Sequence, residues 1–183
     1  MTNTDSLQLR PLLDRLTRLS AADAWADHLT PTQMAALDYL NRANRYSRAP
    51  SQVADYLGAT RGTVSQTLRT LERKGLIEEQ RSTEDKRRIS YDITADGQAA
   101  TGSCDGLDAA VSALPEDDRK ALTQGMRALL TEMVTKRGAR PFGFCRDCRH
   151  HVTGTGGKAR CALLGVALAL DEAGQICHEQ TPV

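Results

Sequence analysis

Residues 50–97 predict two short helices joined by a tight turn, a pattern that few folds accommodate. The first helix is expected to be capped by Ser51 and to end at Gly58, because serine satisfies free amides at a helix start and glycine tolerates the left-handed turn at a helix end. A second helix is expected from about Arg61 to Lys74, with Gly75 after it. The apolar residues recur at helical spacing and predict one buried face on each helix. These positions are Val53, Ala54, Leu57, Val64, Leu68 and Leu71.

A hairpin with a basic tip is predicted directly after the second helix. Leu76–Ile77 opens its first strand, and the alternating apolar residues Ile89, Tyr91 and Ile93 predict the return strand. The loop between them, residues 82–88, ends in adjacent basic side chains. Two helices, a tight turn and such a hairpin are typical of a winged helix-turn-helix. The predicted fold class is therefore mostly α with a small β wing.

The outward face of the second helix carries side chains that suit DNA. Long or hydroxylated donors and acceptors reach phosphates and base edges when such a helix lies in a major groove. Taken one at a time, each of these residues is equally well explained as part of a solvated helix face, so the prediction depends on the whole unit. The predicted major-groove contacts are Arg61, Thr63, Ser65, Gln66 and Arg69.

Two segments of this unit resemble the MarR family of transcriptional regulators. They are LRTLERKGLIEE, from Leu68 to Glu79, and DKRRISYDITADG, from Asp85 to Gly97. The resemblance covers roughly residues 6–137. It implies a homodimer that regulates transcription, with repression as the expected mode. Two copies related by a two-fold axis would bind the two halves of a palindromic operator in double-stranded DNA.

The resemblance also implies roles for residues of the wing. Asp85 is expected to steady Arg87, while Arg87 and Arg88 contact the DNA backbone or the minor groove. In this family, small molecules bind between the dimer helices and the DNA-binding unit. A small-molecule effector is therefore an alternative signal for this chain, although no residue identifies one.

Apolar stripes on both sides of the unit predict helices that could pair two chains. One covers residues 5–24, with Asp5 or Ser6 as its expected cap, and another follows Pro115. Either stripe could form one side of a monomer's core, and the resemblance favours a dimer interface. Thr30-Pro31 marks a further helix start. The predicted division is 1–30 for an N-terminal dimerisation helix, 31–97 for the DNA-binding domain, 98–137 for C-terminal dimerisation helices and 138–183 for a cysteine-rich metal-binding tail.

The last 39 residues, 145–183, hold four of the five cysteines and predict a metal site. Cys145 and Cys148 have the two-residue gap that lets both thiolates face one metal, while Cys161 and Cys177 stand alone. The N-terminus is polar and has no signal peptide, so the expected compartment is the reducing cytoplasm. Clustered thiols in that compartment bind metal more often than they form disulfides. Disulfides remain an alternative for these four cysteines.

An iron–sulfur cluster, with [4Fe-4S] first, is favoured over Zn²⁺ as the occupant of this site. Structural zinc usually pairs two C-x2-C knuckles, whereas single cysteines around one knuckle suit a four-thiolate cluster. Zinc is kept as the alternative because His150, His151 and His178 could replace a cysteine. With a cluster, the tail would sense redox, oxygen or iron status. With zinc, the tail would be structural and a small molecule would be the signal.

Charge is unevenly distributed although the formal net charge is only +1. Residues 136–160 contain seven Lys or Arg against Asp147 alone, which indicates a basic tail. No apolar run approaches the roughly 20 residues that span a bilayer, so no membrane association is expected. No nucleophile–base arrangement stands out, so we do not expect an enzyme. A redox enzyme or electron-transfer protein is the least favoured alternative.

Overall fold

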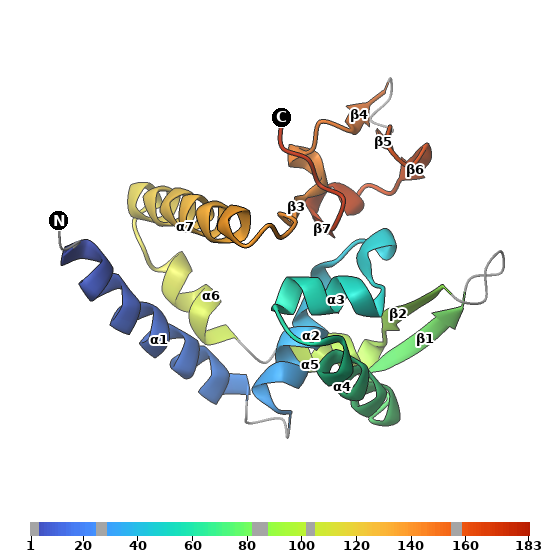
Figure 1. Ribbon diagram of the computed structural model, residues 1–183, viewed down its shortest axis with the longest axis horizontal. Helices are drawn as coiled ribbons and strands as arrows, with labels where there is room; N and C mark the ends of the chain where they lie inside the picture. Colours follow the sequence, from blue (N-terminus) through green and yellow to red (C-terminus); the bar gives the residue numbers. More distant parts are fainter. Residues whose placement is uncertain (1–3, 25–28, 82–87, 102–104, 155–158) are drawn as a thin grey trace.

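The computed structural model describes residues 4–24, 29–81, 88–101, 105–154 and 159–183. Figure 1 shows a helical arm, a winged-helix head and a small tail built from short strands. The arm is α1 (Thr4–Ala24), α6 (Asp105–Ser112) and α7 (Glu116–Lys136). The head, residues 29–101, contains α2 (Pro31–Arg42), the 3-10 turn η2 (Arg45–Ser47), α3 (Pro50–Leu57), α4 (Arg61–Arg73), β1 (Ile77–Arg81), β2 (Ile89–Ile93) and α5 (Ala95–Thr101). The tail, residues 138–183, contains β3 (Gly143–Phe144), η3 (Cys145–Asp147), β4 (His151–Thr153), β5 (Ala159–Cys161), β6 (Val166–Leu168), η5 (Glu172–Gly174) and β7 (Ile176–Cys177).

Two helix starts in the head follow from local side-chain hydrogen bonds. Before α2, the Thr30 hydroxyl accepts the amide of Gln33 over 3.3 Å, and the Gln33 side chain accepts the Thr30 amide over 3.1 Å. This reciprocal cap, with Pro31 in the first turn, confirms the predicted helix start. Before α4, the Thr60 hydroxyl accepts the amide of Thr63 over 3.2 Å.

The expectation that Ser51 caps α3 is wrong. The helix begins one residue earlier, at Pro50, so Ser51 lies inside the first turn. The Gln52 side chain accepts the amide of Ala49 over 2.8 Å, and proline has no amide to satisfy, so the turn closes without the serine. The end of the helix is as predicted, because Gly58 adopts a left-handed φ of +60°.

The wing is confirmed as an antiparallel hairpin. β1 pairs with β2, and Ile77 lies opposite Ile93. The amide of Tyr91 also donates to the carbonyl of Arg48 over 3.1 Å, so the segment before α3 runs beside the return strand. This contact holds the connection between α2 and α3 next to the wing.

Gly97 closes the wing onto the end of α4. A Cβ at this position would lie 2.1 Å from the carbonyl oxygen of Leu76, so a larger residue would displace the backbone. The Thr94 hydroxyl fastens the same corner, since it donates to the Gly75 carbonyl over 2.7 Å and accepts the Gly97 amide over 3.1 Å. Thr94 and Gly97 therefore act together to fix this corner.

The hydrophobic core of the head includes one residue of the tail. Ile176 is only 7% exposed and belongs to the same cluster as the head's buried residues. A parallel bridge joins Ala43 to Ile176, and the amide of Asn44 donates to the Ile176 carbonyl over 2.9 Å. The tail therefore packs on the head directly. The largest fully buried side chains of the head are Tyr39, Leu37, Leu40, Leu68, Leu71, Ile77, Val53 and Val64.

Within the described residues, the tail forms two small antiparallel sheets. β3 pairs with β7, which places Gly143 opposite Cys177. β5 lies between β4 and β6, and His151 lies opposite Cys161. These short pairings bring the segments that carry the four cysteines into one small unit.

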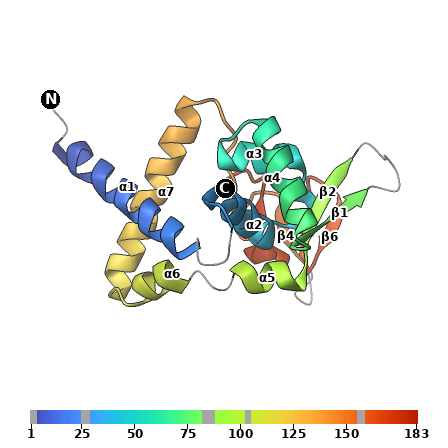
Figure 2. The same ribbon diagram turned by 90° about the horizontal axis from the view of Figure 1, so that it is seen from below.

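The arm lies on the side of the head away from the wing (Figure 2). Its first helix begins at Thr4, so the expectation that Asp5 or Ser6 caps it is wrong. Apolar side chains along α1 and α7 are exposed in the single chain, as shown by Leu12 at 58% and Leu130 at 59%. Among the helices of the described part, none is long and apolar enough to cross a membrane.

Candidate functional site

The helix α4 presents the predicted DNA contacts on one polar face. Arg61, Thr63, Gln66 and Arg69 are exposed, and Ser65 is partly buried. The opposite face supplies the head's core, so the polar face is the part of α4 that is open to a ligand. The buried residues of that opposite face are Val64, Thr67, Leu68 and Leu71.

One of these five contacts has a second role. The hydroxyls of Thr63 and Thr60 are 2.9 Å apart, so Thr63 is part of the hydrogen-bonded start of α4. In the wing, Arg88 is exposed at the beginning of the return strand. Asp85 and Arg87 lie outside the described residues, and their pairing stays a prediction.

A cleft of about 990 Å³ lies between α4, the wing, η2 and the tail. Arg61 and Ser65 of α4 line it together with Arg88 of the wing. In the described part of the chain, the lining contains five arginines, against one acidic residue, Glu179. A concave surface with this balance attracts a polyanion. Three of the predicted contacts thus meet at one cationic surface, whereas Thr63, Gln66 and Arg69 do not line this cleft.

Three arginines of this lining were not predicted from the sequence. Arg45 and Arg48 belong to the connection between α2 and α3, and Arg81 ends β1. Arg48 is fixed by Asp92, since its Nη1 lies 2.7 Å from the Asp92 carboxylate. Their charge was visible in the sequence, but their position beside the wing depends on long-range pairing. For Arg45 and Arg48, the local signal in the sequence is a pair of arginines with two residues between them just before α3.

The tail cysteines are close neighbours and are free thiols. Cys145, Cys148 and Cys177 are buried, at 4%, 7% and 8% exposed, and Cys161 is partly buried. The amide of Cys148 donates to the carbonyl of Cys145 over 3.2 Å. Burial, and then the proximity of the Cys177, Cys161 and Cys148 thiols, raises the pKa of Cys145 to about 11. The four predicted metal ligands therefore influence one another electrostatically.

Cys177 lies where the tail meets the head. Burial raises its pKa, while hydrogen bonds from the Asn44 side chain, the Glu179 amide and the Ser47 hydroxyl act in the opposite direction. Asn44 and Ser47 belong to the head and are only 2% and 1% exposed. Such donors stabilise a thiolate, the form of cysteine that binds metal.

The donor set suits thiolate ligation by its chemistry. Among the described residues, no three His, Cys, Asp or Glu side chains are grouped as the ligands of one metal ion. Four free thiols, most of them buried, fit a metal group by their chemistry. The Cys148 sulfur also accepts the amide of Thr181 over 3.4 Å. A role for His150 or His151 as a replacement ligand stays a prediction.

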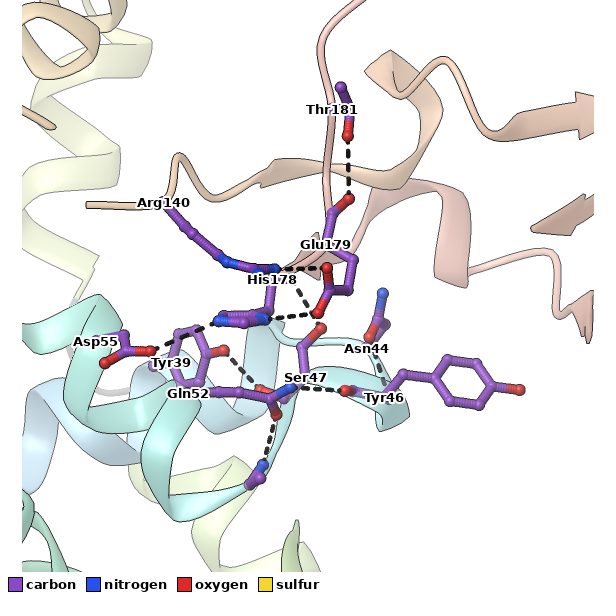
Figure 3. Close-up of polar contacts among 11 residues, drawn as sticks. Tyr39, Asn44, Tyr46, Ser47, Gln52, Asp55, Arg140, His178, Glu179 and Thr181 are labelled. Atoms are coloured by element: carbon purple, nitrogen blue, oxygen red, sulfur yellow. Dashed lines mark hydrogen bonds and ion pairs between the residues drawn. The ribbon is translucent and has the colours of Figure 1, made fainter. Parts of the chain in front are cut away.

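His178 connects the tail to α3 (Figure 3). Its Nε2 lies 3.6 Å from an Asp55 carboxylate oxygen of α3, and its Nδ1 lies 3.3 Å from the Glu179 carboxylate. Its backbone amide donates to the Ser47 hydroxyl over 2.9 Å. Arg140, just after the arm, holds Glu179 from the other side at 2.7 Å. Both ring nitrogens of His178 therefore face carboxylates at the junction of arm, tail and head.

The head has the fold of a winged helix-turn-helix, the class defined by a helix such as α4 and a wing such as β1–β2. A cationic cleft lies between this helix and this wing. Residues 29–88 match the model of the MarR family, so this part of the chain is similar to the winged helix-turn-helix of that family. MepR of S. aureus, solved as a complex with DNA, is 26% identical with a TM-score of 0.55, and the match covers 74% of this chain and 98% of MepR.

Two further solved structures share the fold. FabT of Streptococcus pneumoniae, solved in complex with DNA, is 21% identical with a TM-score of 0.59, over 73% of this chain and 97% of FabT. The MarR family transcription regulator SP03579 is 23% identical with a TM-score of 0.59, over 74% of this chain and 95% of that protein. Among curated proteins, none matches this chain. Each of these three matches leaves about a quarter of this chain uncovered.

Proposed function

We propose that the chain is a DNA-binding transcriptional regulator of the MarR type, and that it acts as a repressor. The observation that carries the proposal is the shared cleft, which is lined by Arg61 and Ser65 of α4 and by Arg88 of the wing. Among the described residues, its lining contains five arginines in all and one acidic residue. MepR, which shares the fold at 26% identity, was solved bound to DNA. In this reading α4 enters the major groove and the wing contacts the backbone or minor groove.

The arm would pair two such chains. The apolar side chains of α1 and α7 are exposed in the single chain, where they have no core to join. Burying them against a second copy would remove this surface from water and place two heads on one two-fold axis. A symmetric dimer would then bind a palindromic operator.

The tail would add a metal group that the regulator uses to sense redox, oxygen or iron status. Cys145, Cys148, Cys161 and Cys177 would hold a [4Fe-4S] cluster. The donor set supports a metal group, because the four thiols are free and those of Cys148, Cys161 and Cys177 raise the pKa of Cys145. The spacing in the sequence favours a cluster over zinc, because single cysteines around one C-x2-C knuckle suit a four-thiolate cluster, whereas structural zinc usually pairs two knuckles.

The alternative is a structural zinc in the tail with a small-molecule effector. A second cleft, of about 610 Å³, supports it, because it lies between α3, the segment after α7 and the tail. Its lining includes Asp55, Arg140 and His178, a polar set able to bind a small charged molecule. An effector there would contact the arm connection and the head together.

Two measurements on protein purified without oxygen test this function. Iron, sulfide and zinc analysis with an absorption spectrum should give about four iron per chain and broad absorption near 400 nm. A duplex selected from a random pool should bind with a steep salt dependence, and with different affinity when the metal is removed. One zinc per chain would support the alternative, and equal DNA affinity with and without metal would refute sensing by the tail.

Variants of the predicted contacts test the placement of the DNA surface. Arg69→Ala should weaken specific binding by about 1–3 kcal/mol if the arginine contacts a base edge. Arg88→Ala should weaken binding to all sequences and make the salt dependence shallower. Normal operator binding by both folded variants would show that the DNA surface lies elsewhere.

A further inference from the structure

We infer that Arg45 is a DNA-phosphate contact that the tail holds in position through Glu172, so that the DNA-binding surface is built jointly by head and tail. The inference rests on the proposed DNA-binding function. It adds a residue that neither the sequence pattern nor the MarR-type unit of α4 and wing identifies.

Two contacts from the tail hold the Arg45 side chain of the head. Its Nε lies 3.3 Å from a Glu172 carboxylate oxygen, and its Nη2 donates to the Ala167 carbonyl over 3.0 Å. Its guanidinium also lies over the ring of Tyr46, 4.8 Å from the ring centre. A planar guanidinium held at two nitrogens and against a ring has little freedom to rotate.

The tail side of this contact is buried and hydrogen-bonded. The Glu172 side chain is only 6% exposed, and its second carboxylate oxygen accepts the amide of Ala169 over 2.6 Å. A buried carboxylate needs such partners to offset its lost hydration. Arg45 supplies the compensating charge, so the buried acid and the arginine are each fixed by the other.

The other side of Arg45 is open. Its side chain remains 52% exposed and lines the cleft that Arg61 and Arg88 also line. Glu172 is not part of that lining, so its buried carboxylate holds the guanidinium from behind and does not itself face an anion in the cleft. A phosphate that reaches the cleft would therefore meet a pre-oriented guanidinium.

Through this contact, the tail would change the affinity of the head for DNA. Ala167 lies in β6 and Glu172 in η5, and both elements precede β7, whose Cys177 is one of the four tail thiols. If the tail detaches or rearranges, Arg45 keeps its charge but is no longer held by Glu172 and Ala167. Fixing its side chain on a DNA phosphate then costs more conformational entropy. The state of the tail would thus change binding without a change in the arm.

The test compares variants on a duplex that the wild-type protein selects from a random pool, across a series of salt concentrations. Arg45→Ala should bind on the order of ten-fold more weakly. Its plot of log affinity against log salt should be shallower by about 1.8, because each of the two chains of a dimer loses one phosphate contact worth about 0.9. Arg45→Lys keeps the charge and should retain the wild-type slope.

Glu172→Gln separates position from charge. It removes the anchor but leaves Arg45 charged, so binding should weaken about three-fold with the slope unchanged. If Glu172 merely neutralised the cleft, the same variant would bind DNA more tightly, and that result would overturn the positioning role. Circular dichroism and metal content should match the wild type, and Arg45→Ala and Arg45→Lys decide the phosphate contact even if the glutamine variant unfolds the tail.

Lys120→Ala is the matched control, because Lys120 is an exposed cation on α7 paired with Glu116 and outside the cleft. It should leave affinity and slope unchanged. If the wild type binds DNA and Arg45→Ala matches it in both, the inference fails while the proposed function stands. If the wild type binds no selected duplex, both fall together.

Discussion

The amide of Asn44 in the head donates a hydrogen bond to the carbonyl of Ile176 in the tail over 2.9 Å. The side chain of Ile176 enters the head's core at the same place. A segment near the end of the chain is therefore part of the core of the winged-helix head. Changes in the tail would act on the head at the connection between α2 and α3.

Ile176→Ala should destabilise the whole head. The side chain is 7% exposed, and truncating a buried isoleucine costs about 2–4 kcal/mol in lost burial and cavity formation. Denaturant unfolding followed by the helical circular dichroism signal measures this cost. Leu170→Ala, at a side chain that is 90% exposed, should change it by less than about 0.5 kcal/mol. A head transition unaffected by Ile176→Ala would mean that the tail is only loosely attached.

Ser47→Ala should loosen the tail and its thiol site together. The hydroxyl accepts the His178 amide over 2.9 Å in a buried setting, so its loss costs about 1–3 kcal/mol. The same hydroxyl lowers the pKa of Cys177, so that pKa should rise further in the variant. A chelator should then remove bound metal faster than from the wild type.

Thr67→Val provides the control for Ser47→Ala. Thr67 is also buried, but its hydroxyl donates to the Thr63 carbonyl within α4, away from the tail. This variant should lower stability without changing the rate of metal release. Equal release rates for the two variants would refute a role of Ser47 at the thiol site.

Alkaline pH should destabilise the protein through Tyr39. Burial is the main cause that raises the pKa of this phenol above its usual value near 10, and its hydroxyl donates to the Ser47 carbonyl over 2.6 Å. The unfolded chain therefore releases the Tyr39 proton at lower pH than the folded chain. This contribution to stability is complete below about pH 10 and declines by up to about 1.4 kcal/mol per pH unit above it.

Tyr39→Phe isolates this effect. The variant lacks the hydrogen bond to Ser47 and should be less stable than the wild type at neutral pH. Its free energy of unfolding should fall less steeply above about pH 10, so the two stability curves converge. Parallel curves would show that Tyr39 ionises equally in both states.

Leu130→Glu should separate the chains without unfolding the head. Leu130 is 59% exposed on α7, and a carboxylate there would have to be buried in the proposed dimer. Sedimentation should show at least about ten-fold weaker self-association, since burying one unpaired charge costs more than about 1.4 kcal/mol. Leu170→Glu, on the tail, should leave the dimer intact, and a wild-type protein that is already monomeric would contradict the proposal.

Local signals in the sequence were enough to predict most of the head. The reciprocal cap at Thr30 and the left-handed glycine at Gly58 involve residues a few positions apart, so they depend on local chain geometry. The buried stripe of α4 and the alternation of β2 followed from the periods of helix and strand. The start of α3 was misplaced because Pro50 and Gln52 close the turn without a serine cap.

The cysteine spacing predicted a thiol-rich tail, but it carried no information on where that tail would pack. The sequence by itself determined the helices, the wing and the set of thiols, because each depends on residues close together in the chain. The tertiary structure decided that Ile176 joins the head's core, that Asn44 and Ser47 face Cys177, and that Glu172 holds Arg45. These contacts join segments far apart in the chain, so they form only when burial and hydrogen bonding at the junction outweigh the entropy of closing the long loop between them.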